Sequence, residues 1–363
     1  MHSLKKIVSI LITATILSSN NFACTGLTLK TTGDNSYISG RTLEFGKGLL
    51  TFEILAVPNN FSYSGTLMDN QKGLKWTTKY KHVGFGLTNY NIIVDGINEQ
   101  GLSSGMFYFP GFAKFQSLNK TNKNKSLSAH ELVSWILGNC ATVEEVKQKL
   151  PTINVIGTEL KELDCIPPLH FNVNDKNGHS IVIEYTKGKL TVYDNPIGVL
   201  TNSPSFDWHL TNLRNFVGLK PTSETQIDID GLKLSPFGNG SGAFGLPGDF
   251  TPPSRFIRAS FFKLSSSPSK TASQAVKKIF HILNQFDIPD GANIYATNDQ
   301  KHTEITLWTS ISDLKNLKYY FHTYNNRRVR MLNLKNIIFN KNKILRLNYG
   351  KKEEIKNITG KLK

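Results

Sequence analysis

Cys24 constrains the interpretation of this chain more than any other residue, because of what precedes it. Lys5 and Lys6 are followed by an apolar run over residues 7–17 and then by a small residue, Ala23. This order of parts is typical of a secretory signal peptide, and the run is too short for a transmembrane helix, which needs ~20 residues. We therefore expect residues 1–23 to be a signal peptide, and the mature protein to be periplasmic or secreted and to begin at Cys24.

Three interpretations of Cys24 follow from its position. It could be an ordinary buried or disulfide-bonded cysteine. It could carry a lipid, although Asn21 stands where lipoprotein cleavage sites usually have leucine. Or it could be an N-terminal nucleophile, because a freed α-amine with a pKa of ~7.7–8.0 can act as the base for the thiol on the same residue.

Charge suggests a second class of function. The formal net charge is +16, and the segment 327–363 is dense in lysine and arginine. Such an excess can indicate nucleic-acid or membrane binding. However, we find no zinc-ligand spacing, RNA-binding signature or phosphate-binding loop. We favour a solvated basic tail over residues 336–363, and expect no nucleic-acid partner, no stable membrane anchor, no cofactor and no metal.

The remaining length, about 340 residues, suffices for one large domain, which we place at residues 24–335. Turn signals and alternation predict strands at 27–31, 37–40, 51–57, 82–86, 90–94, 101–109, 169–173, 179–184, 189–193, 293–296, 304–310 and 317–323. Helical spacing and caps predict helices at 128–137, 142–150, 206–216, 255–264 and 271–286. Two groups of strands with helices between them indicate an α+β fold of stacked sheets. Cys140 and Cys165 could form a disulfide, which the sequence leaves open.

Several residues could support thiol chemistry. Arg41 could lower the pKa of a nearby thiol and Glu44 could hold an α-amine, although their spacing alone favours a surface ion pair. Asn202 and the backbone N–H of Tyr108 could stabilise an oxyanion. Turn formation and core packing are the plainer explanations for these two. Arg255 alone could be an exposed cation at the start of a helix.

Six motifs in order resemble the choloylglycine hydrolase family, which includes bile salt hydrolases and penicillin V acylases. They are CTGLTL from Cys24, GRTLEFG from Gly40, NEQGLSSGMFYFPGFA from Asn98, DNPIGVLTNSPSFDWHLTNL from Asp194, GLPGDFTPPSRFIRASF from Gly245 and LWTSISDLKNLKYYFHTYNN from Leu307. The resemblance extends from Cys24 to about residue 335. It implies an N-terminal-nucleophile hydrolase with a four-layer αββα sandwich.

The resemblance also implies roles for single residues. Cys24 matches the nucleophile, Arg41 the adjacent cation, Asn202 the oxyanion asparagine and Arg255 a second active-site arginine. Tyr108 stands where bile salt hydrolases tend to have asparagine and penicillin V acylases tyrosine. Glu44 replaces the more usual aspartate, and one residue is inserted between Cys24 and Arg41.

We therefore predict an exported cysteine amidohydrolase that cleaves a linear C–N amide through an acyl-thioester. A non-catalytic lipoprotein or basic surface-binding protein is the alternative. Alternation in the strand 101–109 places Met106 and Tyr108 on one face, as an apolar wall for the acyl half of a small amide substrate. We accordingly rank phenoxyacetyl (penicillin V) and fatty acyl (acyl-homoserine lactone) substrates above conjugated bile salts. A homo-oligomer is compatible with the sequence.

Overall fold

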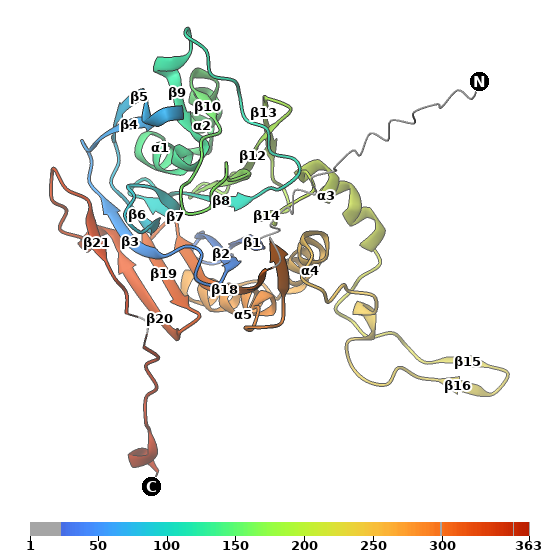
Figure 1. Cartoon of the computed structure of the whole chain (residues 1–363). Coiled ribbons are helices and arrows are strands. Elements are labelled where there is room, and N and C mark those ends of the chain that lie inside the picture. Colours follow the sequence, from blue (N-terminus) through green and yellow to red (C-terminus); the bar gives the residue numbers. More distant parts are fainter. Residues whose placement is uncertain (1–22, 298–299, 351, 363) are drawn as a thin grey trace, which may run out of the picture.

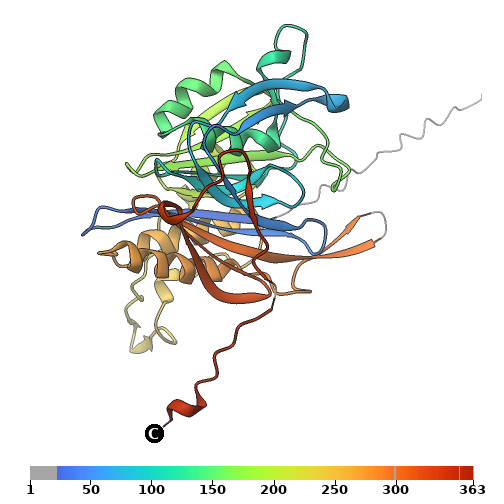
Figure 2. The same ribbon diagram turned by 90° about the vertical axis from the view of Figure 1, so that its left-hand side faces the viewer.

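The protein was analysed as a computed structural model, which describes residues 23–297, 300–350 and 352–362. Two large antiparallel sheets lie face to face, with helices on both outer faces (Figures 1 and 2). This is the αββα sandwich that the sequence predicts. None of the helices in the described ranges is long and apolar enough to cross a lipid bilayer.

The first sheet contains the start of the predicted mature chain. Its strand order is β14 (Val199–Leu200), β1 (Cys24–Lys30), β2 (Tyr37–Gly46), β18 (Gln300–Asp313), β19 (Lys318–Thr323) and β20 (Asn326–Asn333), with β17 (Ile294–Thr297) paired to β18. A tight turn joins β1 to β2 as an antiparallel hairpin and sets Gly26 opposite Arg41. The register therefore brings Arg41 close to Cys24.

The second sheet carries the strand with Met106 and Tyr108. Its order is β13 (Lys189–Asp194), β12 (Ser180–Thr186), β11 (Leu169–Asp175), β8 (Leu102–Tyr108), β7 (Ile93–Asn98), β6 (His82–Leu87), β3 (Phe52–Val57) and β21 (Leu345–Leu347). Between the sheets, Phe85 of β6 stacks on Trp308 of β18 with ring centroids 4.2 Å apart. The core therefore joins strands that are distant in sequence.

Helices cover the outer faces of both sheets. α4 (Pro252–Ser265) and α5 (Ala272–Leu283) pack on the first sheet, whereas α1 (Leu132–Asn139) and α2 (Val143–Lys149) pack on the second. In α5 the buried residues recur at helical spacing, and Thr271 with Gln274 forms a capping box at its start. α3 (Phe206–Asn212) follows β14 and continues as a 3₁₀ turn to Phe216, as predicted for residues 206–216.

Three small ribbons complete the fold. They are β4 (Ser62–Thr66) with β5 (Lys72–Thr77), β9 (Ser126–Ser128) with β10 (Asn154–Ile156), and β15 (Ile227–Ile229) with β16 (Leu232–Leu234). The last of these projects away from the body (Figure 1). The sequence analysis predicted none of the three ribbons.

Two further differences concern segment boundaries. The strand predicted at 90–94 begins at Ile93, because residues 87–92 form the turn after β6. The basic segment after residue 326 is only partly a tail, since β20 extends the first sheet and β21 pairs with β3, beyond the predicted domain end at residue 335. Arg327 and Arg328 remain exposed on β20, where charge discourages pairing of an edge strand with another chain. Cys140 and Cys165, whose pairing was left open, are both free.

Candidate active site

Cys24 opens β1 and is buried between its neighbours in the first sheet. Its Sγ accepts a hydrogen bond from Nη2 of Arg41 at 2.9 Å. Arg41 is itself buried, and its remaining donors bind the backbone carbonyls of Met106 at 2.5 Å and Thr42 at 3.2 Å. The guanidinium therefore has a fixed orientation, with one N–H directed at the sulfur.

Asn202 holds the other side of the cysteine. Its Oδ1 accepts from the backbone N of Cys24 at 2.8 Å and from Nη2 of Arg255 at 2.6 Å, and its Nδ2 donates to the carbonyl of Tyr108 at 2.8 Å. Arg255, in the first turn of α4, also donates through Nη1 to the carbonyl of Cys24 at 2.5 Å. The structure thus brings together six of the residues selected from the sequence, namely Cys24, Arg41, Met106, Tyr108, Asn202 and Arg255.

The protonation of the thiol depends on two opposing effects. Burial raises the pKa of Cys24, whereas the positive charges of Arg41 and Arg255 and a hydrogen bond from the backbone N–H of Tyr108 lower it. Burial is the largest of these effects, so the net pKa is above the ordinary thiol value. A buried thiol of this kind needs a base to become a nucleophile.

Among the described residues, the backbone nitrogen of Cys24 donates to Asn202 and not to the carboxylate of Glu44. That nitrogen is an amide in the intact chain, so the expected contact of Glu44 with a free α-amine stays a prediction. The carboxylate of Glu44 instead accepts from Thr306 on the neighbouring strand, and its Oε2 has no hydrogen-bond partner among the described residues. Burial raises the pKa of Glu44 to about 8. Its backbone N–H donates to the carbonyl of Ala23, at the predicted cleavage point, at 3.0 Å.

Three residues that the sequence did not single out also support this site. Glu304, on β18, accepts from the backbone N of Ala23 at 2.5 Å. Two buried histidines then fix the loop around Asn202, since His170 contacts the carbonyl of Thr201 at 3.1 Å and His209 that of Asn202 at 3.0 Å. Of the three, His209 lies within the motif that starts at Asp194, seven residues after Asn202.

A narrow apolar pocket, here called the apolar pocket, opens beside Cys24. Met106 and Tyr108 both line it, as the alternation along this strand predicts. Other lining residues come from both sheets and from the loop before β11, and they include Leu43, Phe45, Leu160, Leu163 and Leu169. The hydroxyl of Tyr108 and the thiol of Cys165 are hydrogen-bond partners, which ties this loop to β8.

A second, more polar pocket surrounds Ala23. It is lined by Ser203, Asn293, Tyr295, Glu304 and Arg255 among others and has a volume of about 570 Å³. Cys24 lines the apolar pocket, whereas the residue before it lines this polar one. The cysteine therefore stands between an apolar and a polar compartment, an arrangement suited to the two halves of an amide.

Comparison with known proteins agrees with this geometry. Residues 24–345 match the family model described as linear amide C–N hydrolases, choloylglycine hydrolase family. A bile salt hydrolase/transferase from Clostridium perfringens is 34% identical over 92% of this chain and 99% of its own length. A penicillin V acylase from Pectobacterium atrosepticum is 26% identical over 91% of this chain and 85% of its own length.

Comparison with solved structures leads to the same family. A crystal structure of a variant conjugated bile acid hydrolase from Clostridium perfringens superposes with a TM-score of 0.81 at 32% identity, covering 93% of this chain and all of the other. The penicillin V acylase of Agrobacterium tumefaciens shares the fold, with a TM-score of 0.71 at 23% identity over 90% of this chain and 92% of its own. The chain belongs to the choloylglycine hydrolase family and is a linear amide C–N hydrolase.

Proposed function

We propose that Cys24 is the nucleophile of this hydrolase and acts once its α-amine has been freed. The observation that carries the proposal is the pair of contacts on one residue, with Arg41 on the sulfur and Asn202 on the nitrogen. These contacts fix the thiol and the future amine in one place. An α-amine there can take the thiol proton that burial otherwise retains.

The reaction then proceeds in two halves. The α-amine accepts the thiol proton, and the thiolate attacks the acyl carbon. The N–H of Tyr108 and the amide of Asn202 stabilise the oxyanion, after which the C–N bond breaks and the amine leaves with a proton. Water, activated by the same α-amine, hydrolyses the acyl-thioester and restores the thiol.

Exposure of the amine requires removal of residues 1–23, which we propose to be a cleaved export signal. Ala23 is held at its nitrogen by Glu304 and at its carbonyl by the backbone N–H of Glu44. Both bonds end when Ala23 is removed, and the polar pocket around it is then free for the amine half of a substrate.

For the acyl half we propose a slender apolar group in the apolar pocket. The pocket is lined almost wholly by apolar side chains, and the side chain of Tyr108 takes up space beside the nucleophile. These features favour phenoxyacetyl or fatty acyl groups over a four-ring steroid. The names of the relatives do not decide between a slender and a steroid acyl group, since they include bile salt hydrolases and a penicillin V acylase.

The test is a comparison of kcat/KM on penicillin V, a long-chain acyl-homoserine lactone and glycocholate, with Cys24→Ala as the inactive control. We expect penicillin V or the lactone to be preferred. A preference for glycocholate of about tenfold, equivalent to ~1.4 kcal/mol in transition-state binding, would overturn the substrate ranking. Amidase activity in Cys24→Ala would show that Cys24 is not the nucleophile.

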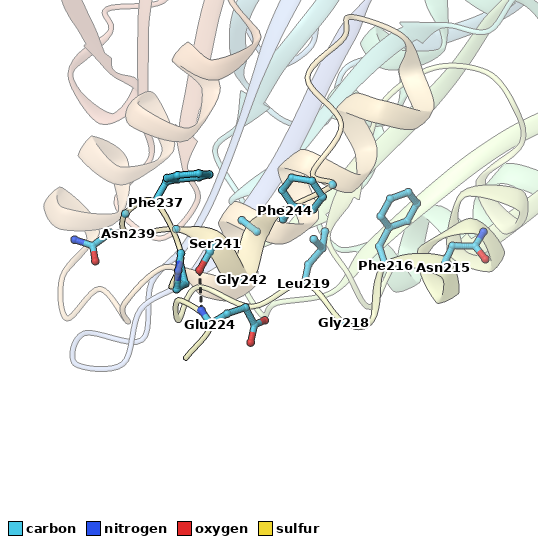
Figure 3. Close-up of a pocket in the computed structure, with 15 residues that line it drawn as sticks. Asn215, Phe216, Gly218, Leu219, Glu224, Phe237, Asn239, Ser241, Gly242 and Phe244 are labelled. Carbon is cyan, nitrogen blue, oxygen red and sulfur yellow. Dashed lines mark hydrogen bonds between the residues drawn. The ribbon is translucent and has the colours of Figure 1, made fainter. Parts of the chain in front are cut away.

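We also propose that the enzyme associates with further copies of itself through the projecting segment 216–245, here called the arm. In the β15–β16 ribbon, Ile227 pairs with Leu234 and Ile229 with Leu232, so four exposed aliphatic side chains share one face. At the base of the arm, Phe216, Leu219, Phe237 and Phe244 line an open hollow of about 950 Å³ (Figure 3). An apolar ribbon and an apolar hollow on one molecule suit reciprocal docking of two copies.

A further inference from the structure

Most of the excess positive charge of the chain lies in one stretch, residues 327–363, here called the basic segment. This stretch holds twelve lysines and arginines against two glutamates, a net charge of +10 out of the formal +16 of the whole chain. The match to the family model ends at residue 345, inside the basic segment. The chemistry that the family shares therefore does not explain why positive charge is concentrated here.

The two glutamates of the basic segment are used at the base of its last part. Glu353 accepts a hydrogen bond from the backbone N of Arg327 at 2.9 Å, and Glu354 forms an ion pair with Arg328 at 3.1 Å. Beyond these contacts with β20, residues 352–362 extend away from the body (Figures 1 and 2). Lys356 and Lys361 are exposed there and form no ion pair among the described residues. The projecting part therefore presents uncompensated positive charge.

Large aliphatic side chains lie among these cations. Ile355, Ile358 and Leu362 are 86%, 59% and 83% exposed, and Ile338, in the loop between β20 and β21, is 92% exposed. The first three recur at intervals of three and four residues, the spacing that would place them on one face of a helix. Aliphatic residues that gather on an exposed segment indicate a surface that another molecule covers.

The aromatic residues of the basic segment are not available to such a partner. Phe339 and Tyr349 pack against the core, and the ring centroid of Tyr349 lies 5.5 Å from that of Phe85. Arg330 is also used internally, since it donates to the carbonyl of Tyr349 and lies over the ring of Phe321. Single-stranded nucleic acids bind on exposed aromatic rings, which the outer surface of this segment lacks in its described part.

What the basic segment exposes is a mixture of cations and aliphatic groups. A nucleic-acid backbone would pair with the cations but would leave the aliphatic side chains in water. The surface of an anionic bilayer suits both, because its headgroups attract lysine and arginine and its acyl boundary accepts apolar side chains. The chemistry of the segment therefore favours a lipid surface.

We propose that the basic segment docks the enzyme on the surface of a bilayer that contains anionic phospholipids. The lysines and arginines bind the headgroups, and Ile355, Ile358 and Leu362 enter the boundary between headgroups and acyl chains. This association is peripheral and reversible, and it differs from a stable membrane anchor, which the sequence does not lead us to expect. The proposal concerns location and is independent of the proposed nucleophile and substrate.

The first experiment is co-sedimentation of the purified enzyme with vesicles. It compares vesicles of phosphatidylcholine alone with vesicles that contain about one-third phosphatidylglycerol. We expect the partition coefficient to be at least about tenfold higher on the anionic vesicles and to fall as salt screens the attraction. Equal partition onto neutral and anionic vesicles would overturn the proposal.

A charge reversal tests whether the basic segment is responsible. Lys356→Glu combined with Lys361→Glu should lower the partition coefficient on anionic vesicles by about tenfold or more, because attraction to the headgroups becomes repulsion. Lys75→Glu combined with Lys189→Glu is the matched control. It makes the same change of net charge on β5 and β13, where both lysines are exposed and form no ion pair among the described residues. An equal loss in the control would show a general effect of net charge and would overturn the docking site.

The aliphatic contribution is tested separately. Ile355→Ser combined with Leu362→Ser should remove the part of the binding that persists at high salt, because apolar contact is not screened. A serine variant that binds as tightly as the wild type would contradict the proposed contact with the acyl boundary. All of these positions are exposed, so melting temperature and kcat/KM on a soluble amide should stay unchanged.

The last experiment compares the two kinds of anionic partner. Fluorescence anisotropy with a labelled single-stranded oligonucleotide is measured at the salt concentration of the vesicle experiment. Weaker binding to the oligonucleotide than to anionic vesicles supports a lipid surface, whereas tighter binding would assign the basic segment to nucleic acid and would overturn the proposal. Vesicle binding by a protein that cleaves no amide would count against the proposed function alone.

Discussion

The active site and the arm differ in how far their side chains are covered and paired within one molecule. Around Cys24 nearly every polar group is paired, and Arg41, Asn202 and Arg255 are each held by two or more hydrogen bonds. In the arm, the aliphatic side chains of β15 and β16 are between 45% and 60% exposed, and Phe237 and Phe244 are more exposed still. The site is complete within one molecule, whereas the arm leaves apolar surface uncovered.

This difference indicates that the active site determines the chemistry and that the arm determines assembly. Residues fixed by several partners can position reacting atoms without reorganisation, so changes there should affect chemistry. An apolar arm gains stability only when its face is covered, so changes there should affect assembly. The predictions below test this separation.

Asn202→Ala should have the largest effect. It removes the proposed oxyanion donor and the acceptor for the nitrogen of Cys24 together. We expect kcat to fall by ~10²–10³-fold with little change in melting temperature. Retained turnover, or loss of turnover only through unfolding, would reduce Asn202 to a residue that shapes the loop.

Glu44→Gln tests the buried carboxyl by its pH dependence. The pKa of Glu44 is about 8 in the folded protein against an ordinary value of 4.5, so the folded state retains a proton that the unfolded state releases. The stability from this group is full below pH ~4.5 and is lost as pH rises towards ~8. Chemical denaturation from pH 4 to pH 8 should therefore show a smaller decline for Glu44→Gln than for the wild type, by on the order of 4 kcal/mol. Parallel profiles would contradict a neutral Glu44.

Leu232→Asp probes the arm. A charge on the apolar face of the β15–β16 ribbon should convert an oligomer into protomers in size-exclusion chromatography with light scattering, while kcat/KM changes by less than about twofold. Lys233→Asp, on the opposite face of the ribbon, is the control and should leave the mass unchanged. If Leu232→Asp has the mass of the wild type, the arm is not the interface.

Tyr108→Asn should have the smallest effect and concerns selectivity alone. The exchange keeps the backbone N–H that faces the sulfur but widens the apolar pocket. We expect the kcat/KM ratio of glycocholate over penicillin V to rise by up to about tenfold, or ~1.4 kcal/mol. Tyr320→Asn, outside the pocket, should leave the ratio unchanged. An unaltered ratio in Tyr108→Asn would show that this side chain does not limit the acyl group.

The sequence predicted the parts of this account that depend on local pattern. Alternation and turn signals located most strands of both sheets, and the motifs led to Cys24, Arg41, Asn202 and Arg255. What it could not supply depends on register between distant strands. The orientation of Glu44 is set by Thr306 on β18, more than 250 residues away, and β20 and β21 were hidden by a basic composition that resembles a tail.

The most direct test of the central claim is the state of the N-terminus of the active enzyme. Intact-mass and N-terminal analysis of purified, active protein should show a chain that begins at Cys24 with a free α-amine, and a folded variant that retains Ala23 should be inactive because its nitrogen is an amide. Full amidase activity in a verified chain that still carries Ala23, or a lipid on Cys24 of the active protein, would contradict the proposed mechanism.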